Sequence, residues 1–466
     1  MPSDKLINKI TLKGGQAELL TIAFPMIIST ACDGIMTFTD RLFLARLGPE
    51  QMNAAMGGGV ALQLMIFFFI GLTGYSTALV AQYLGSGQKK MCPVAATQSF
   101  IIALVAYPLI LLCRPLAHQY FSFMELPAGQ LQYQVAYFNI VIFGAFAGIL
   151  RNCFSCYFSG IGKTRIVMVA NIFAMFVNVG LDYVFIYGKL GFPEMGIRGA
   201  AFATVIGGIC GLIILSIAYV SKQNRMEFGI SGSFRFDPKV MRKLLYFGYP
   251  AGLELFMNFL AFSALIFIFH SQGNVIATAS TIMFNWDLVS FIPLIGIEIS
   301  VTSLVGRYMG AGDPATAHRA AMSGIKLGLY YSVVILMLFV FMPRALVMVF
   351  RPENSVEIFN QAVPIAENMI KLASLYVLAE AVMVAIVGAL RGAGDTHFTM
   401  LISVAAHWTM LPVVYVIMNV LHWSAVAAWL GLIIAFLLFC GILVLRYRSG
   451  KWQRIKVIED IIGDNS

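Results

Sequence analysis

Acidic and amide side chains inside otherwise apolar stretches are the residues of this chain whose types and spacing could do chemistry. Asp33 and Asp40 are seven residues apart in one such stretch. Asn171, Asn178 and Asp182 follow one another at spacings of seven and four residues in another. On a helix, these spacings place the side chains of each stretch nearly on one face. If the two faces meet, carboxylates and amides converge on one site.

A hydroxyl joins this group if Thr204, in the next apolar stretch, lies alongside. Carboxylate, amide and hydroxyl oxygens are ligands that suit a hard cation such as Na⁺. A buried carboxyl with a like charge beside it can instead bind and release a proton. A polar network that only holds helices together is the other interpretation, and it suits Asp33 and Asn171 better than the rest.

Four more acids lie in apolar stretches of the second half of the chain. They are Glu254, Asp287, Glu298 and Glu380, and each is a possible ligand for an ion or a substrate. Asp287 and Glu298 are eleven residues apart, which corresponds to three helical turns along one face. Acids outnumber bases in these stretches, and an acid-rich interior attracts cationic ligands.

The composition shows which elements must position these residues. Of 466 residues, 59% are hydrophobic and 11% are charged, with a mean hydropathy of +0.84. Soluble proteins carry about 25% charged residues, so this chain lacks the polar surface of a soluble protein. Its apolar stretches are continuous rather than alternating, which excludes a membrane β-barrel. The chain is predicted to be an all-α membrane protein.

Twelve segments are long enough to span a bilayer, which takes about 20 residues of helix. We place them at residues 18–45, 55–84, 92–113, 129–153, 165–187, 199–221, 244–270, 277–308, 316–342, 360–390, 397–419 and 423–446. With a cytoplasmic N-terminus, 21 of the 31 Lys and Arg residues fall on the cytoplasmic side and 6 on the opposite side. Basic loops stay in the cytoplasm, so both termini are expected there, in a multi-pass protein of the cell inner membrane.

Three pairs of positions repeat in order along the chain. They are Pro25 and Pro250, Leu84–Gly87 and Met309–Gly312, and Gly160–Thr164 and Gly392–Thr396. The first two pairs are 225 residues apart and the third is 232 apart. Such a repeat predicts two related halves of six helices each.

The expected organisation is therefore an N-terminal lobe (1–221, helices 1–6), a basic cytoplasmic linker (222–243), a C-terminal lobe (244–446, helices 7–12) and a cytoplasmic tail (447–466). Because six is even, each lobe enters and leaves the membrane on the same side. The pseudo-two-fold axis then runs along the membrane normal, with a central cavity between pseudo-symmetric lobes.

Other function classes find little support. The Cys153–Cys156 pair stands on an apolar helix, which argues against a zinc or redox site. The Gly162–Thr164 turn has Tyr157 where a phosphate-binding loop needs glycine. We recognise no nucleophile, base and oxyanion donor in reach of one another, so we expect no enzyme and no cofactor beyond a coupling ion. The net charge of +9 reflects topology rather than nucleic-acid binding.

Longer motifs run through both halves. In the first half they are Pro25, Thr39-Asp40, Arg46-Leu47-Gly48, Gln82–Gly87, Gly160–Thr164, Asn178-Val179-Gly180-Leu181-Asp182 and Gly196–Thr204. In the second half they are Pro250-Ala251-Gly252, Leu304–Arg307, Gly310–Asp313 and Leu390–Thr396. In this order and spacing they make nearly the whole chain resemble the multidrug and toxic compound extrusion (MATE) family of cation-coupled antiporters.

The resemblance implies that Asp40, Asn178, Asp182 and Thr204 form the Na⁺ or H⁺ site of the N-terminal lobe, and no metal other than Na⁺ is expected there. Glu380 matches a family acid ten residues before the Leu-Arg-Gly turn. Many family members have an acid eight residues after the helix 7 proline, where this chain has Asn258 and carries its acid at Glu254 instead. We therefore expect coupling in the N-terminal lobe.

The expected function is export of organic cations and multiple drugs by alternating access, in exchange for Na⁺ or H⁺. The expected partners are cationic amphipathic small molecules and membrane lipid, with no nucleic acid, and the chain is expected to be a monomer. The alternative is a flippase for a lipid-linked precursor, which would need cationic residues in its cavity to hold a pyrophosphate. A membrane-embedded transferase or hydrolase and a channel are the remaining alternatives.

Overall fold

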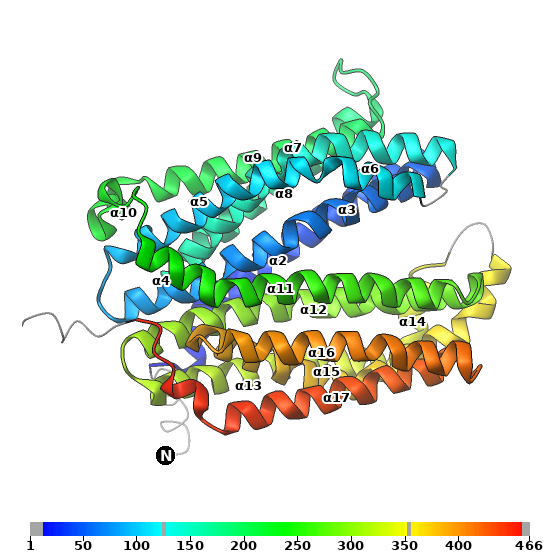
Figure 1. Cartoon of the computed structure of the whole chain (residues 1–466). Helices are drawn as coiled ribbons and strands as arrows, with labels where there is room; N and C mark the ends of the chain where they lie inside the picture. Colours follow the sequence, from blue (N-terminus) through cyan, green and yellow to red (C-terminus); the bar gives the residue numbers. More distant parts are fainter. Residues whose placement is uncertain (1–12, 124–126, 352–355, 459–466) are drawn as a thin grey trace, which may run out of the picture. The chain divides into compact units, whose positions relative to one another are not determined.

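The structure is a computed structural model that describes residues 13–123, 127–351 and 356–458. The first half contains α2 (Gln16–Ala45), α3 (Pro49–Gly74), α4 (Ser76–Gly85), α5 (Met91–Leu112), α6 (Arg114–Phe123), α7 (Ala128–Gly160), α8 (Thr164–Tyr187) and α9 (Ile197–Tyr219). The linker contains α10 (Lys222–Phe228) and the 3₁₀ turn η1 (Ile230–Gly232). The second half contains α11 (Pro238–His270), α12 (Asn274–Gly310), α13 (Pro314–Phe341), α14 (Pro343–Met348), α15 (Val356–Ala393), α16 (Thr396–Tyr415), the π-helical turn η2 (Val416–Val420), α17 (Ala425–Arg448) and the 3₁₀ turn η3 (Lys451–Arg454) (Figure 1).

Within the described residues, twelve spans are long and apolar enough to cross a membrane, which confirms the all-α membrane fold. The second span is made of two helices, α3 and α4, which meet at Tyr75. The short helices α6 and α14, which follow the third span of each half, were not expected from the sequence. Helix α6 opens with Arg114-Pro115 and is only ten residues long, so its sequence lacks the continuous apolar run of a span. Its buried residues are Ala117 and Phe121.

The contacts divide the chain into two compact units. Of the described residues, the N-terminal unit holds 22–253, 310–312 and 457–458. The C-terminal unit holds 13–21, 254–309 and 313–456. These units are defined by contacts between residues and not by the order of the spans. The lobe boundaries expected from the sequence therefore stay a prediction.

In the N-terminal unit, glycines on α9 let α8 approach closely. A Cβ on Gly199 would lie 2.7 Å from the backbone carbon of Phe185, and one on Gly207 would lie 2.9 Å from Cβ of Asn178. These two contacts place α8 directly against α9. The polar stripe of α8, which contains Asn171, Asn178 and Asp182, is buried inside the unit. A second group of helices, α3, α5 and α7, packs around buried residues that include Phe138.

In the C-terminal unit, α15 is the most buried span. It packs against α13 and α17, and Trp429 of α17 contacts Phe269 and Phe284 in the apolar core. A Cβ on Gly388 of α15 would lie 2.7 Å from the Glu298 carbonyl oxygen. Close packing of α15 on α12 therefore requires glycine at position 388, because any side chain there would meet the backbone of α12.

The repeated glycine turns adopt the same backbone conformation in both halves. Gly162 and Gly394 have φ angles of 77° and 98°. The backbone amide that follows each glycine donates to a carbonyl five residues earlier, Lys163 to Phe158 and Asp395 to Leu390, both at 2.8 Å. This is the Schellman helix end, in which glycine takes the left-handed position at no steric cost.

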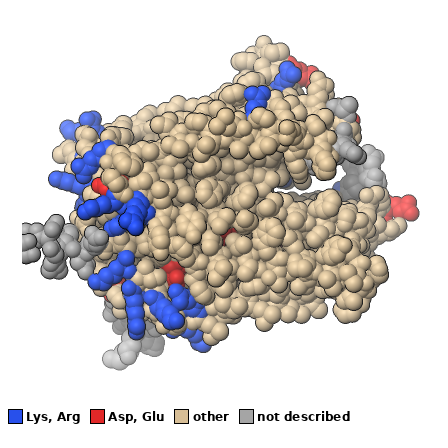
Figure 2. Space-filling view, viewed as in Figure 1, with Lys and Arg blue, Asp and Glu red and all other residues tan. Residues whose placement is uncertain are grey.

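Basic side chains gather at one end of the N-terminal unit. Figure 2 shows Lys and Arg around α10 and the start of α11, while the long helical faces beyond them are almost free of charge. A lipid-facing helix surface has this character.

Candidate functional site

Three helices of the N-terminal unit bring the predicted ion-site residues together. The Asp40 carboxylate of α2 accepts hydrogen bonds from Asn178 Nδ2 of α8 at 3.3 Å and from Thr204 Oγ1 of α9 at 3.0 Å. Asp182, one turn after Asn178, is fully buried and interacts electrostatically with Asp40. Thr204 is exposed, so this group of four residues has an accessible edge. We call it the Asp40 cluster.

The Asp40 cluster has too few donors for its acceptors. Both carboxylate oxygens of Asp182 and Oδ1 of Asn178 are buried and accept no hydrogen bond from the residues that the structure describes. Ionised carboxylates accept but cannot donate, and leaving such groups buried without a partner is costly. A proton on one carboxyl or a bound cation would relieve this excess of acceptors.

Tyr137 of α7 is a member of this site that the sequence did not single out. Its hydroxyl is in hydrogen-bonding reach of Thr204, and it interacts electrostatically with Asp40 and Asp182. The side chain is 8% exposed. Nothing in the apolar sequence of α7 distinguishes this tyrosine from the others, since its position follows only from the packing of α7 on α9.

Asp33 and Asn171, on the same stripes as the Asp40 cluster, form a second group around Arg151 of α7. The Arg151 guanidinium pairs with Asp33 Oδ1 at 3.1 Å and donates to Asn171 Oδ1 at 3.2 Å. Asn171 in turn donates to Ser29 Oγ at 2.7 Å and to Asp33 Oδ2 at 3.5 Å. The stripes expected from the sequence thus carry two separate groups. Arg151 forms an ion pair within the second group, whereas Arg41 interacts electrostatically with Asp40 and Tyr137 beside the first.

The acids of the C-terminal unit also separate into two groups. Arg391, in the last turn of α15, contacts Glu298 Oε1 of α12 at 2.5 Å and Glu254 Oε2 of α11 at 3.3 Å. In the other group, Tyr376 donates to Asp287 Oδ1, and Glu380 interacts electrostatically with Asp287. Oε2 of Glu380 is buried without a donor among the described residues.

Asp287 and Glu298 share helix α12 but not a site. Eleven residues of helix separate them by about 16 Å along the axis, so each meets a different part of α15. Sequence reasoning missed Arg391 and Tyr376, because a helix-end arginine and a tyrosine in an apolar span are common and carry no spacing signal.

Asn258, where the sequence departs from the family pattern, bonds to a neutral side chain of α16. Its Nδ2 donates to Ser403 Oγ of α16 at 2.8 Å. This position of the C-terminal unit therefore makes a neutral contact between α11 and α16.

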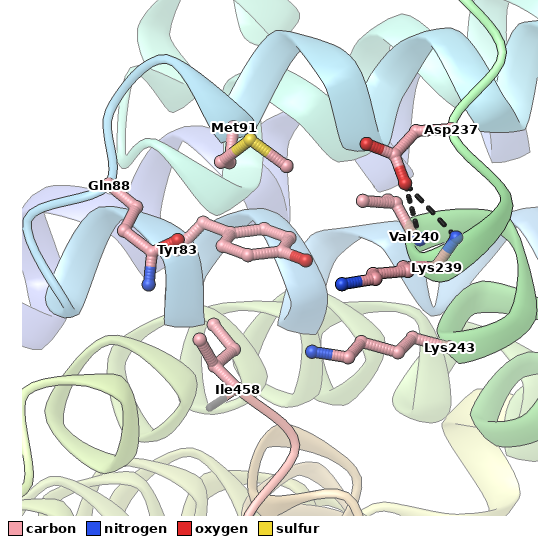
Figure 3. A pocket seen from close by; sticks show the side chains of 8 residues that line it. All are labelled: Tyr83, Gln88, Met91, Asp237, Lys239, Val240, Lys243 and Ile458. Carbon is pink, nitrogen blue, oxygen red and sulfur yellow. Dashed lines mark hydrogen bonds between the residues drawn. The ribbon is translucent and has the colours of Figure 1, made fainter. Parts of the chain in front are cut away.

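A small cavity of about 170 Å³ lies near the linker in the N-terminal unit. Its lining residues are Tyr83, Gln88, Met91, Asp237, Lys239, Val240, Lys243 and Ile458. Figure 3 shows the side chains of Lys239 and Lys243 extending in the same direction, toward Tyr83. Asp237 Oδ1 accepts from the backbone amides of Lys239 and Val240 at 3.0 and 3.1 Å and caps α11. None of the predicted site residues lines this cavity, and its two ammonium groups do not suit a cationic substrate.

The MatE family model matches residues 25–184 and again residues 250–416. The chain belongs to the MatE family. The two matches start 225 residues apart and end 232 apart, which are the two spacings of the repeated motifs. The internal repeat and the resemblance to MATE transporters are thereby confirmed.

Relatives and solved structures agree with this assignment over nearly the whole chain. The "Probable multidrug resistance protein NorM" of Thermotoga maritima is 27% identical over 453 residues, covering 95% of this chain and 94% of the relative. A transporter of the MOP superfamily from Pyrococcus furiosus, whose structure is described as having a binding pocket of reverse polarity, has a TM-score of 0.87 at 16% identity, covering 96% of this chain and 98% of the other. A structure of MATE in complex with MaL6 has a TM-score of 0.86 at 17% identity, covering 96% of this MatE chain and 99% of the other. These structures establish the fold of the MatE chain, which is a multi-pass membrane protein of the transporter family.

Proposed function

We propose that this MatE protein is a secondary active transporter that exports organic cations, including multiple drugs, in exchange for Na⁺ or H⁺. The observation that carries the proposal is the Asp40 cluster, in which two neighbouring carboxyl groups have fewer donors than acceptors. Na⁺ or a proton bound there would neutralise part of the negative charge. The name of the Thermotoga maritima relative, a probable multidrug resistance protein, supports drugs as the exported compounds.

Coupling requires that ion and drug differ in their affinity for two states of the protein. The Asp40 cluster joins α2, α8 and α9 through hydrogen bonds, so binding an ion there alters the packing of three helices at once. We propose that this change favours the outward-facing state in an alternating-access cycle. The ion itself would then return to the cytoplasm as the drug leaves.

Asp287 and Glu380 form a second candidate ion or substrate site. Tyr376 satisfies one oxygen of Asp287, while Glu380 keeps a buried acceptor without a donor among the described residues. Glu254 and Glu298, by contrast, already share the guanidinium of Arg391. We therefore rank Asp287 and Glu380 above the other two acids as ligands of the C-terminal unit.

The charge of the interior distinguishes drug export from lipid-precursor flipping. A flippase that holds a pyrophosphate needs cations that are free to bind it. Arg391 is matched by two carboxylates and Arg151 by one, which favours cationic ligands over polyanionic ones. The protein would break no covalent bond and need no cofactor, and we place it in the cell inner membrane as a monomer with both termini in the cytoplasm.

Ethidium efflux from proteoliposomes tests the function. A Na⁺ gradient and a pH gradient are imposed separately on vesicles with the native protein, Asp40→Asn, Asp182→Asn or the exposed acid variant Glu357→Gln. We expect one gradient to drive efflux, both site variants to abolish coupling, and Glu357→Gln to behave like the native protein. If neither gradient moves a cationic dye, drug antiport is wrong and the flippase becomes the better proposal.

A further inference from the structure

The cavity beside the linker is fixed in place by a buried glutamine. Gln98 of α5 is fully buried, and its side chain bonds to the linker backbone at two points. Its Nε2 donates to the Arg235 carbonyl at 2.9 Å, and its Oε1 accepts from the Asp237 amide at 3.2 Å. Asp237 in turn caps α11. The start of α11 is thereby held against α5, so the cavity is part of the packed structure.

Two ammonium groups of α11 lie in this cavity. Lys239 and Lys243 are four residues apart, so both side chains lie on one face of the helix. Neither forms an ion pair with a residue that the structure describes. Asp237 is the one carboxylate among the described lining residues, and its Oδ1 is engaged by two backbone amides. Two positive charges against one negative charge leave the cavity basic.

The donors of this cavity suit a phosphate group. Figure 3 shows the hydroxyl of Tyr83 facing the ammonium groups of Lys239 and Lys243. Lysine is a common ligand of phosphate, which it meets as a point charge, and a tyrosine hydroxyl can donate a further hydrogen bond. The volume of about 170 Å³ far exceeds the roughly 10–15 Å³ that one water needs. The cavity therefore has the charge, the donors and the room for a tetrahedral anion.

Exposed aromatic side chains beside the two lysines indicate that the phosphate belongs to a lipid. Phe234 and Phe236, just before α11, are 61% and 60% exposed. Tyr246 is also exposed, and it follows Lys239 and Lys243 by seven and three residues, on the same face of α11. Aromatic rings next to basic residues are typical of the membrane–water interface, where lipid headgroups lie. A soluble phosphate would make no use of these rings.

We propose that this cavity binds the phosphodiester headgroup of an anionic phospholipid, with the ammonium groups of Lys239 and Lys243 on the phosphate oxygens. Basic pockets at the cytoplasmic ends of membrane-spanning helices recognise such headgroups, and the linker is predicted to be cytoplasmic. The lipid is held at the site and is not a transported substrate, so the proposal is independent of drug export. It also differs from the general attraction of basic residues to an anionic leaflet, because it requires one saturable site.

Native mass spectrometry of the full-length protein in a neutral detergent tests the site. Dioleoyl phosphatidylglycerol is titrated, and the fraction of protein with one bound lipid gives the dissociation constant. Dioleoyl phosphatidylcholine has the same phosphodiester but adds a positive choline, which the lysines repel. Glycerol 3-phosphate has the phosphate without acyl chains, and it is tested as a competitor. We expect one saturable site for phosphatidylglycerol, with at least about tenfold weaker binding of the other two ligands.

Two double variants remove the same charge from different places. Lys239→Gln with Lys243→Gln removes both ammonium groups of the cavity. Lys222→Gln with Arg242→Gln is the matched control, because these two residues are exposed in the same region and do not line the cavity. The loss of charge-assisted hydrogen bonds predicts that the cavity variant binds phosphatidylglycerol about tenfold to hundredfold more weakly, whereas the control binds like the native protein.

A third variant should change the affinity in the opposite direction. Asp237→Asn keeps a side-chain oxygen that can cap α11, and it removes the carboxylate that repels a phosphate from the cavity. We expect phosphatidylglycerol to bind several times more tightly to this variant, since a like charge near the ligand is lost. Tighter binding cannot result from unfolding, so this variant decides the matter if the lysine variant does not fold.

Weaker binding by the cavity variant, together with native-like binding by the control, supports the lipid site. Equal losses in the two double variants overturn it, because they show a general effect of charge. Equal affinity for phosphatidylglycerol and phosphatidylcholine also overturns it, and so does Asp237→Asn binding that is no tighter than native. If glycerol 3-phosphate binds as tightly as phosphatidylglycerol, the ligand is a soluble phosphate and the lipid assignment is wrong. Failure of dye efflux would leave all of these binding results standing.

Discussion

At the scale of single residues, charge matching governs the interior of the C-terminal unit. Arg391 of α15 pairs with both Glu254 of α11 and Glu298 of α12. Removing one partner of a buried ion pair is far more harmful than replacing the whole pair, because the remaining charge stays buried.

Arg391→Gln is therefore expected to destabilise the protein by about 3 kcal/mol, since Glu254 and Glu298 both lose the guanidinium that they share. Adding Glu298→Gln to this variant should recover much of the loss. Thermal unfolding in detergent measures both. Arg344→Gln is the control, because the Arg344 side chain is 80% exposed and lies 3.9 Å from Glu367. An Arg391→Gln protein as stable as this control would contradict the role given to the ion pair.

Spacing along the sequence placed Asp40 on one helix face and Asn178 and Asp182 on another, because seven- and four-residue intervals fix a shared face. It also grouped Asp33 and Asn171 with them, and only the resemblance to the MATE family separated the Asp40 cluster, including Thr204, from those two residues. Spacing alone therefore predicted the stripes but not the division into two groups. It could not find Tyr137 or the pairing of Arg151 with Asp33. Those contacts depend on how α7 rotates against α2 and α9, and the apolar sequence of α7 has no pattern that records this rotation.

At the scale of elements, the close approach of α8 and α9 positions the Asp40 cluster. Gly207 faces Asn178, and its neighbour Gly208 has no atom within 4 Å of an added Cβ. The two glycines are adjacent on the same helix. Substituting each by alanine changes helix propensity equally, so a difference between the two variants reports on packing.

Gly207→Ala is expected to lower stability and ion coupling, because its methyl group would lie 2.9 Å from Asn178 Cβ and push α8 away. Overpacking of this kind costs about 1–3 kcal/mol. Gly208→Ala should be neutral or stabilising by up to about 1 kcal/mol, since alanine favours the helix. Thermal unfolding and ion-driven efflux of both variants provide the check, and equal behaviour of the two would refute the packing argument.

Helix α10 of the linker is tied to two turns of the N-terminal unit by Glu227. Lys163 Nζ donates to Glu227 Oε2 at 2.9 Å, and Lys89 Nζ lies 3.7 Å from Oε1. The hydrogen bond from Lys163 lowers the pKa of Glu227 below its usual value, with Lys89 adding to the effect. The stability from this pair is thus fully present above the unfolded-state pKa and is lost as the pH falls through the lower folded-state pKa.

Glu227→Gln should therefore lower the melting temperature slightly at neutral pH, and the difference should disappear below about pH 4. The effect is small because surface ion pairs contribute about 0–1 kcal/mol. Melting curves between pH 3 and pH 7, compared with those of Glu357→Gln, measure it. A difference that grows as the pH falls would have the wrong sign for this pairing.

The spans themselves followed from hydropathy, whereas the break at Tyr75 and the short helices α6 and α14 did not. A break without proline between α3 and α4 leaves the apolar pattern intact. Short helices at the ends of spans bury only a few residues, such as Phe121 of α6, and so look like loops in sequence.

At the scale of the whole molecule, the positions of the basic residues and the six spans in each half predict how the chain is oriented in the membrane. Basic residues concentrate in the linker and near both termini, and six spans in each half return the chain to the same side. The orientation is a prediction that cysteine labelling can test.

In a cysteine-free background, Glu194→Cys, between α8 and α9, should react with a membrane-impermeant maleimide added to intact cells. Arg235→Cys, in the linker, should react only after the cells are opened. Both native side chains are exposed, so access depends on the side of the membrane alone. The reverse labelling pattern would invert the topology and move both termini outside.

The ion pair between Asp33 and Arg151 also bears on how the protein is made. Its two residues are 118 positions apart in the chain. At about 5–20 residues per second of synthesis, α2 carries its carboxylate for about 6 to 24 s before the codon for Arg151 is read. When α7 enters the bilayer, the Asp33 carboxylate of α2 is thus already present to pair with the Arg151 guanidinium. Loss of Asp33 alone would then appear first as poor membrane insertion of the nascent chain, before any finished transporter exists to be assayed.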